Sequence, residues 1–368
     1  MEAIPVIALA AIIIFLVRKR KKRARQELDL SLAVVGFEAS GKTVYIGSMF
    51  NELRVPGDHG VFLDAIPEKA GKLLSLYNTT ADTDKKFPDS TNKGELIEWP
   101  FTVKVRSAGS VITLGAFRYL DFAGESLRDL YTAAPNPETR RLYDHFKNAD
   151  ILMAMLDGLQ VKRYLENRPR PGFQNDLGTL LALLSGHQKP VNLILAKWDI
   201  LEDQYTFRQV VERLFQINQF AKFVRAQAVP GICRLIPVSS VGPGFAREEG
   251  NAMRKVAGKV INPVRVEVPV ACALPDALTA IRQVKPGPAR ASNLMRWAGT
   301  MKLNMGILTV DLAALNAPPA ASYLSAALGT PAATGQFIRY CEDRLTQFDR
   351  EFPESDLVRF MLQHQQGL

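Results

Sequence analysis

Short apolar runs alternate with amphipathic stretches along most of the chain, and this alternation predicts an α/β fold. Helices are expected over 44–50, 271–281 and 336–352, where apolar residues recur at helical spacing. The last of these helices presents an apolar stripe for packing, either on the same domain or on a partner. Strands are expected where apolar runs end at turn residues, over 30–35, 96–105, 111–120, 149–156, 191–195 and 233–238.

Composition divides the chain into three parts. Alternating strands and helices favour a three-layer sandwich with a mostly parallel sheet over 28–282. Pro-rich and Gly-rich breaks at 285–292 and 317–321 separate this domain from the C-terminal segment. We therefore expect an anchor with a basic flank at 1–27, an α/β domain at 28–282, and a linker with a small helical extension at 283–368.

The net charge of +9 is concentrated near the N-terminus. Seven of the 46 Lys and Arg residues lie within 18–25, and the remaining 39 against 37 acidic residues leave only +2. The fifteen residues before them, 3–17, carry no charge and form about 22 Å of helix at ~1.5 Å per residue. Glu2 precedes the apolar run and the basic residues follow it, which disfavours a cleaved signal peptide.

The N-terminal segment is therefore predicted to be a single-pass helix in the cell inner membrane, with the α/β domain in the cytoplasm. The alternative is an interfacial helix held by anionic lipid. In both cases the lipid contact is made by the N-terminal helix. No specific nucleic-acid partner is expected, because the rest of the chain is almost neutral.

Cysteine and histidine give no sign of a structural metal or a disulfide framework. The three cysteines and four histidines share no ligand-like spacing. They are Cys233, Cys272, Cys341, His59, His145, His187 and His364.

The clearest chemical motif is GFEASGKT at 36–43, between a predicted strand and a predicted helix. It matches GxxxxGK[ST], in which glycines let backbone N–H groups surround phosphate oxygens. Lys42 is expected to reach the β- and γ-phosphates, and the Thr43 hydroxyl to bind Mg²⁺. The residues expected to hold the phosphates are Gly36, Glu38, Ala39, Ser40, Gly41, Lys42 and Thr43.

A second motif, DFAGE at 121–125, follows the strand predicted at 111–120. Asp121 is expected to hold Mg²⁺, and the Gly124 N–H to sense the γ-phosphate. The two motifs together resemble the site of Ras-like GTPases, and this resemblance implies a switch threonine that closes over Mg²⁺ and the γ-phosphate. Thr91 is the choice because a strand follows it directly; Thr83 is the alternative, and a solvated loop threonine is the third interpretation.

Two further strand ends are candidates for reading the base. In AKWD at 196–199, the Asp199 carboxylate can accept two hydrogen bonds from the donor edge of guanine, and the Lys197 stem can lie over the base. The loop Ser239-Ser240 can offer a backbone N–H to the guanine O6. Taken alone, either segment is equally well an ordinary solvated loop.

In this order the four motifs resemble the small-GTPase-like, TRAFAC-class P-loop GTPases, over 28–278. The anchored chain is similar to bacterial double-GTPase proteins and, in layout, to the membrane-anchored subunit of the signal recognition particle receptor. The resemblance implies a P-loop NTPase fold, GTP as ligand and substrate, and Mg²⁺ as cofactor. It also implies that Lys42, Thr91, Gly124 and Glu125 surround the γ-phosphate during hydrolysis.

Two positions depart from the pattern of that class. Ala196 replaces the usual Asn before Lys197, which weakens the case for guanine and leaves an ATPase as an alternative. Glu125 replaces the Gln that orients the attacking water, and a carboxylate there is repelled by phosphate. The expected function is a membrane-anchored GTP-dependent switch with slow hydrolysis and an unidentified effector or activating protein. A non-hydrolysing nucleotide-binding scaffold is the third hypothesis.

Overall fold

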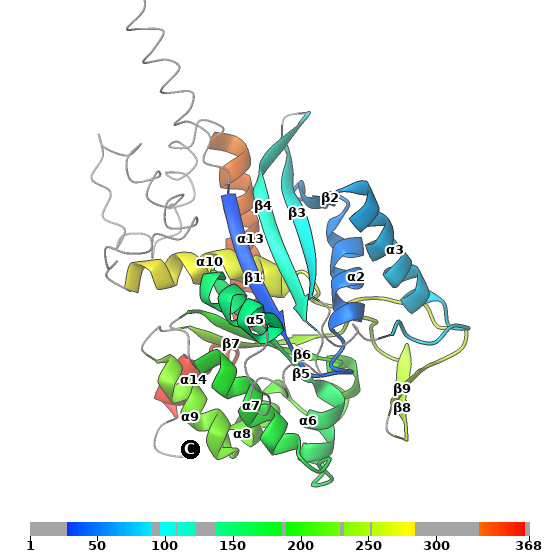
Figure 1. Cartoon of the computed structure of the whole chain (residues 1–368), viewed down its shortest axis with the longest axis vertical. Helices are drawn as coiled ribbons and strands as arrows, with labels where there is room; N and C mark the ends of the chain where they lie inside the picture. Colours follow the sequence, from blue (N-terminus) through cyan, green and yellow to red (C-terminus); the bar gives the residue numbers. More distant parts are fainter. Residues whose placement is uncertain are drawn as a thin grey trace, which may run out of the picture.

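A computed structural model describes residues 28–89, 96–107, 109–122, 137–185, 189–228, 232–250, 252–283 and 331–364. Within these ranges seven strands form one twisted sheet in the order β2-β3-β4-β1-β5-β6-β7 (Figure 1). Their bounds are β1 Leu28–Val35, β2 Val61–Ala65, β3 Leu96–Ser107, β4 Ser110–Phe122, β5 Ile151–Asp157, β6 Val191–Ala196 and β7 Cys233–Val238.

Most neighbouring strands are parallel, as the sequence predicts. The pairs β4–β1, β1–β5, β5–β6 and β6–β7 are parallel, whereas β2–β3 and β3–β4 are antiparallel. Every residue of β6 and β7 is buried, which explains why these strands are continuous apolar runs without alternation.

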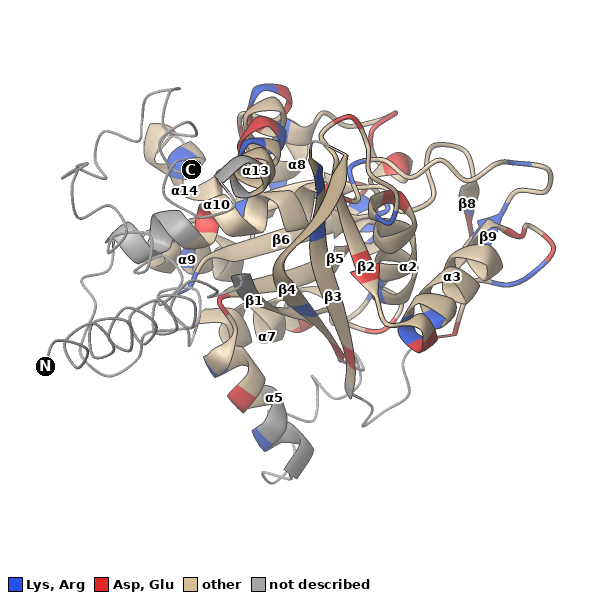
Figure 2. Ribbon diagram, turned by 90° about the horizontal axis from the view of Figure 1, so that it is seen from above, with Lys and Arg blue, Asp and Glu red and all other residues tan. Residues whose placement is uncertain are grey.

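Helices cover both faces of this sheet. Figure 2 shows α10 and α13 on one face and α5 and α7 on the other, which confirms a three-layer sandwich. The bounds are α2 Lys42–Leu53, α3 Pro67–Ala81, α5 Pro137–Asn148, α6 Gly158–Leu165, α7 Phe173–Ser185, η1 Trp198–Ile200, α8 Phe207–Phe215, α9 Asn218–Gln227, α10 Val268–Gln283, α13 Pro331–Glu351 and α14 Leu357–Gln363.

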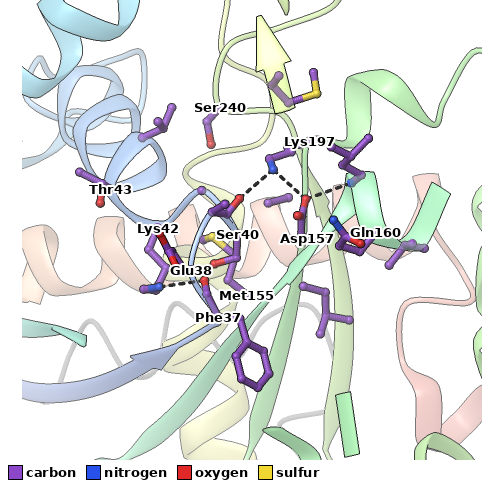
Figure 3. Close-up of a pocket in the computed structure, with 18 of the residues that line it drawn as sticks. Phe37, Glu38, Ser40, Lys42, Thr43, Met155, Asp157, Gln160, Lys197 and Ser240 are labelled. Atoms are coloured by element: carbon purple, nitrogen blue, oxygen red, sulfur yellow. Dashed lines mark hydrogen bonds and ion pairs between the residues drawn. The ribbon is translucent and has the colours of Figure 1, made fainter. Parts of the chain in front are cut away.

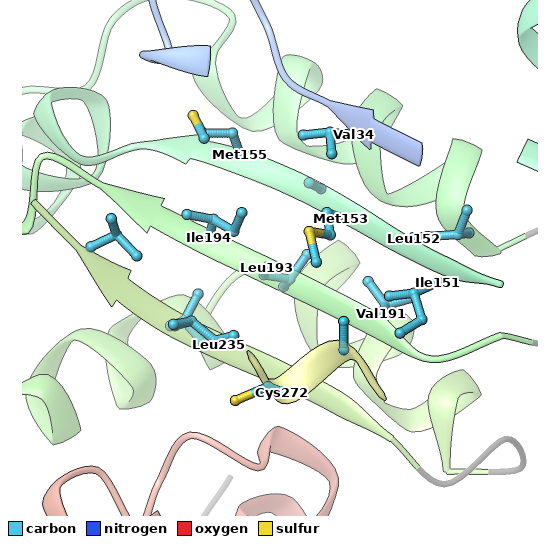
Figure 4. Close-up of a cluster of buried hydrophobic side chains, with 14 of the residues drawn as sticks. Val34, Ile151, Leu152, Met153, Met155, Val191, Leu193, Ile194, Leu235 and Cys272 are labelled. Atoms are coloured by element: carbon cyan, nitrogen blue, oxygen red, sulfur yellow. The ribbon is translucent and has the colours of Figure 1, made fainter. Parts of the chain in front are cut away.

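The core lies between the parallel strands and the helices (Figure 4). Met153 and Leu193, on β5 and β6, are fully buried. Cys272 of α10 packs against these strands from one face and is a buried free thiol, like the other two cysteines. This packing fixes the carboxyl ends of the parallel strands, and the loops that leave those ends emerge on one edge of the sheet.

Two elements of the stretch 51–100 were not predicted from the sequence. Strand β2 pairs with β3 at the sheet edge, and helix α3 packs on α2. Only Leu73 and Thr80 of α3 are buried, so the apolar stripe of this helix is narrow. A five-residue edge strand and a mostly polar helix carry little periodic signal.

The C-terminal segment 331–364 packs on the α/β domain itself. Helix α13 lies against α10 and crosses β2, β3 and β4. Arg234 of β7 donates two hydrogen bonds of 2.9 Å to Asp276 of α10 and one of 2.8 Å to Asp349 of α13. Burial alone lowers the pKa of Arg234, but the two carboxylates more than offset this and raise it. The ion-pair network therefore joins three elements that are far apart in sequence.

Charged residues of both signs are interspersed on the described elements, as on α3 and α13 (Figure 2). The predicted membrane segment 3–17, its basic flank and the linker at 284–330 lie outside the described residues. Of the helices within the described ranges, none has the length and apolar character needed to cross a membrane.

Candidate nucleotide-binding site

The phosphate loop connects β1 to α2. Ala39 and Gly41 have positive φ angles of 60° and 100°, which curl the chain so that successive N–H groups face inward. A side chain at Gly36 would place its Cβ 2.8 Å from Ser40 Oγ and 2.9 Å from the Met155 carbonyl. Glycine is therefore required where the loop leaves β1, as the motif predicts.

Lys42 begins α2 and points back into this loop (Figure 3). Its Nζ donates to the carbonyls of Gly36 and Phe37 at 2.7 and 3.2 Å, and the side chain is buried. Burial lowers the pKa of Lys42, whereas the carboxylates of Asp121 and Glu38 act to raise it. The helix start and this ammonium group supply positive charge to one end of the site.

Asp121 and Thr43 fit the oxygen ligands that Mg²⁺ prefers. Asp121 lies opposite Val34 in the β1–β4 ladder, which places it beside the start of the loop, and it is 1% exposed. Thr43 lines the cavity described below. A hydroxyl and a carboxylate are hard donors, so the residue types agree with the predicted metal.

The other end of the site is built by three adjacent strand ends. Asp157 pairs with Ala196 across β5–β6, and Ala196 pairs with Val238 across β6–β7. Because these strands are parallel, Asp157, Lys197 and the residues after Val238 emerge on one edge of the sheet. The topology thus brings together Asp199 and Ser239, which lie 40 residues apart in the sequence.

Lys197 joins the segment 196–199 to the phosphate loop. Its backbone adopts a positive φ of 57°, and its Nζ donates to the Ala39 carbonyl at 2.8 Å and to Asp157 Oδ1 at 2.7 Å (Figure 3). Asp157 also caps α6 by accepting from the Leu159 N–H at 3.0 Å. The Asp157 carboxylate therefore both caps a helix and positions Lys197.

Asp199 is held in the site by Ser239. The Ser239 hydroxyl donates to Asp199 Oδ1 at 2.6 Å, and it accepts the N–H of Gly242 at 2.8 Å. Burial raises the pKa of Asp199 to about 6, although the hydrogen bond from Ser239 opposes this rise. At neutral pH the carboxylate is ionised and is oriented by its neighbour.

For Ser239, the structure differs from the prediction that the loop 239–240 offers a backbone N–H to the base. The Ser239 N–H donates to the Val264 carbonyl at 3.1 Å, so it is not available to a base oxygen. Ser239 acts through its hydroxyl on Asp199 instead. Ser240 lines the cavity, and its carbonyl accepts from Ser48 of α2 at 2.7 Å.

One cavity of about 710 Å³ connects the two ends of the site. The phosphate loop and Thr43 line one end, and Lys197, Asp199 and Ser240 line the other. Its volume suits a ligand of nucleotide size. Phe87, Pro88 and Asp89, from the loop after α3, also line it, whereas Thr83 does not.

A hairpin that was not predicted from the sequence borders the same cavity. Strands β8 (Ala246–Glu249) and β9 (Ala252–Lys255) form a separate antiparallel pair after the loop 239–245. Met253 of β9 lines the cavity. The sequence signal for this hairpin is the turn dipeptide Gly250-Asn251 between two four-residue segments. Because those segments are rich in charged residues, they lack the apolar pattern that predicts strands.

Thr91, Gly124 and Glu125 lie outside the described residues, so their predicted roles stay predictions. Asp89 is the last described residue before Thr91, and it borders the cavity. Within the described ranges, no cluster of three or more His, Cys, Asp or Glu residues is arranged as a metal site.

The sheet order, the phosphate loop after β1 and the ligand-sized cavity at the strand ends define a P-loop α/β fold. Comparisons with protein-family models and with curated proteins find no match. Among solved structures, the G domain of the T. maritima FeoB iron transporter matches with a TM-score of 0.27 and 12% sequence identity. The match covers 58% of this chain and 89% of that chain. The fold assignment therefore rests on the topology and the loop geometry.

Proposed function

We propose that the chain is a GTP-binding protein that uses Mg²⁺, hydrolyses GTP slowly, and acts as a nucleotide-dependent switch for a partner protein at the inner membrane. The observation that carries this proposal is the single cavity with Lys42 at one end and an oriented, ionised Asp199 at the other. A guanine nucleotide needs positive charge around its phosphates and a carboxylate that accepts from the N–H donors of the base.

Guanine is favoured because Asp199 is a pure acceptor at neutral pH. Guanine presents two N–H donors on one edge, and adenine presents no matching pair. Ala196 removes one possible brace of the base site, but Lys197 ties this segment to the phosphate loop and Ser239 fixes the carboxylate. These bonds support guanine recognition without an Asn at position 196.

Thr43 and Asp121 are the residues that would hold Mg²⁺, which neutralises charge on the β- and γ-phosphates when bound. Thr91 would complete the metal site, and Gly124 would report the γ-phosphate. We expect slow hydrolysis because Glu125 is an anion next to phosphate oxygens and is a poor guide for an attacking water.

Nucleotide competition tests the base assignment in the full chain in detergent. GTP should displace a fluorescent GTP analogue at least about 100-fold better than ATP does. The reason is that only guanine can donate two hydrogen bonds to the charged Asp199 carboxylate. Asp199→Asn should weaken the binding of GTP and strengthen the binding of xanthosine triphosphate, because the 2-carbonyl of xanthine can accept from the Asn amide. Asp203→Asn, an exposed position in the same loop, is the matched control. A preference for ATP in the wild type would reject the guanine assignment.

Ala196 keeps an ATPase as the second candidate, and the same competition experiment decides between the two. Single-turnover measurements with GTP and Mg²⁺ then test hydrolysis. Slow turnover that is lost in Lys42→Ala supports a GTPase. Tight binding without any turnover, alone or with membranes, supports the scaffold hypothesis.

A further inference from the structure

The β8–β9 hairpin is held at two places beside the nucleotide cavity. On one side Arg163 of α6, which is buried, donates from Nε and Nη2 to Glu248 at 3.1 and 3.0 Å, and to the Gly250 carbonyl at 2.7 Å. On the other side Lys255 donates to the carbonyls of Thr79 and Asp82 at 2.5 and 2.9 Å. The hairpin therefore spans from α6 to the C-terminal end of α3.

An apolar cluster, separate from the main core, joins this hairpin to the site. Val241 and Phe245 of the loop before β8 and Ala246 of β8 are buried together, and Met253 and Phe87 pack against them. Phe245 is completely buried although the hairpin projects from the domain (Figure 1). Such a cluster stabilises the hairpin in one position over the cavity.

We propose that the β8–β9 hairpin is a strap over the nucleoside half of the bound nucleotide, with the Met253 side chain packed on the base. This proposal rests on the proposed nucleotide-binding function. Five residues separate the strap from Ser240, which lies at the base-reading end of the cavity. A thioether has no hydrogen-bond donor for phosphate oxygens, but it packs well on an aromatic ring.

The strap sets how fast nucleotide leaves. Release requires the hairpin to move away from the cavity, and that movement breaks the Arg163–Glu248 pair, which is largely shielded from solvent. Hydrogen bonds between charged groups of this kind are stronger than those at an exposed surface. Met253 and Glu248 therefore act on the same step, one by contact with the base and the other by holding the strap closed.

Stopped-flow dissociation of a fluorescent GDP analogue from the full chain in detergent tests the strap. Met253→Ala and Glu248→Gln should each raise the dissociation rate roughly tenfold. Met253→Leu should restore a nearly wild-type rate. Arg254→Ala, next to Met253 but at an exposed position of β9, should leave it unchanged. Thermal unfolding without nucleotide serves to check that the variants are folded.

Competition by inorganic tripolyphosphate separates contact with the base from an effect on the phosphate loop. Met253→Ala should leave tripolyphosphate affinity unchanged. If the wild type binds nucleotide and Met253→Ala releases it at the Arg254→Ala rate, or if tripolyphosphate binding weakens equally, the strap is refuted and nucleotide binding stands. If the wild type binds no nucleotide, the proposed function and the strap both fail.

Discussion

Asp199→Asn should make the nucleotide-free protein more stable at neutral pH while it removes the proposed guanine recognition. Asp199 is 6% exposed, and its one side-chain hydrogen-bond donor among the described residues is the Ser239 hydroxyl. Burying an ionised group with few partners is unfavourable. An amide has the same shape, can still accept from Ser239, and carries no charge.

The size of the gain follows from the pKa of Asp199, which burial raises from an ordinary 3.8 to about 6. This difference between unfolded and folded protein is equivalent to about 3 kcal/mol at neutral pH. The amide NH₂ replaces a carboxylate oxygen and brings donors for which the described hydrogen bonds of Asp199 include no acceptor, which costs about 1 kcal/mol. The net gain in the free energy of unfolding should therefore be about 2 kcal/mol.

The pH dependence distinguishes this cause from others. Because the folded pKa of Asp199 is raised, ionisation lowers the stability of the wild type as pH rises from about 4 to about 6. Below that window the carboxyl is protonated in both states and the penalty is absent. The advantage of Asp199→Asn should thus be roughly 1.5 kcal/mol smaller at pH 5 than at pH 7.5.

Urea unfolding of nucleotide-free protein, followed by the fluorescence of the buried Trp99 and Trp198, measures this difference. Asp203→Asn should change stability by less than about 0.5 kcal/mol, because that residue is exposed. A destabilising ionised Asp199 is ruled out if Asp199→Asn is no more stable than the wild type at pH 7.5, or if its advantage is the same at both pH values.

Three further outcomes are expected. The preference for GTP over ATP should decline in competition assays as pH falls through about 6, because protonated Asp199 no longer accepts two hydrogen bonds. Gly158→Ala should lower the free energy of unfolding by about 1–3 kcal/mol, since its Cβ would lie 2.1 Å from a β6 carbonyl. Gly71→Ala, on an open helix face, is the control and should be neutral or stabilising. Arg234→Met should lower the free energy of unfolding in urea by about 3–5 kcal/mol, because it leaves Asp276 buried without its cation. The double variant Arg234→Met with Asp276→Leu should recover most of that loss.

The phosphate loop could be predicted from the sequence because its chemistry is local. Gly36 and Gly41 are needed for backbone reasons that act within a few residues, and Lys42 begins the helix after the loop. The parallel strands were predictable for a similar reason, since a strand buried on both faces must be a continuous apolar run. In these cases the constraint and its sequence signal lie in the same short segment.

The remaining features depend on contacts between distant segments. The apolar spacing of 336–352 predicts a helix but does not say what the helix packs on. The structure places α13 on the sheet through Asp349 and Arg234, which are 115 residues apart. The β8–β9 hairpin is likewise held by Arg163, 85 residues before Glu248. Such pairs of distant residues leave no periodic pattern in the sequence, so the packing of α13 and of the hairpin could not be predicted from it.

The contacts of the segment 196–199 compensate for the Asn that Ala196 replaces. From the sequence, a missing Asn weakened the case for guanine. In the structure Lys197 takes a left-handed backbone conformation, at an energetic cost of about 1 kcal/mol or more, and its ammonium ties the segment to the Ala39 carbonyl. Two residues after this turn, Asp199 accepts a hydrogen bond from Ser239. The segment 196–199 is therefore tied to the phosphate loop by Lys197, so Ala196 is not by itself an argument for adenine.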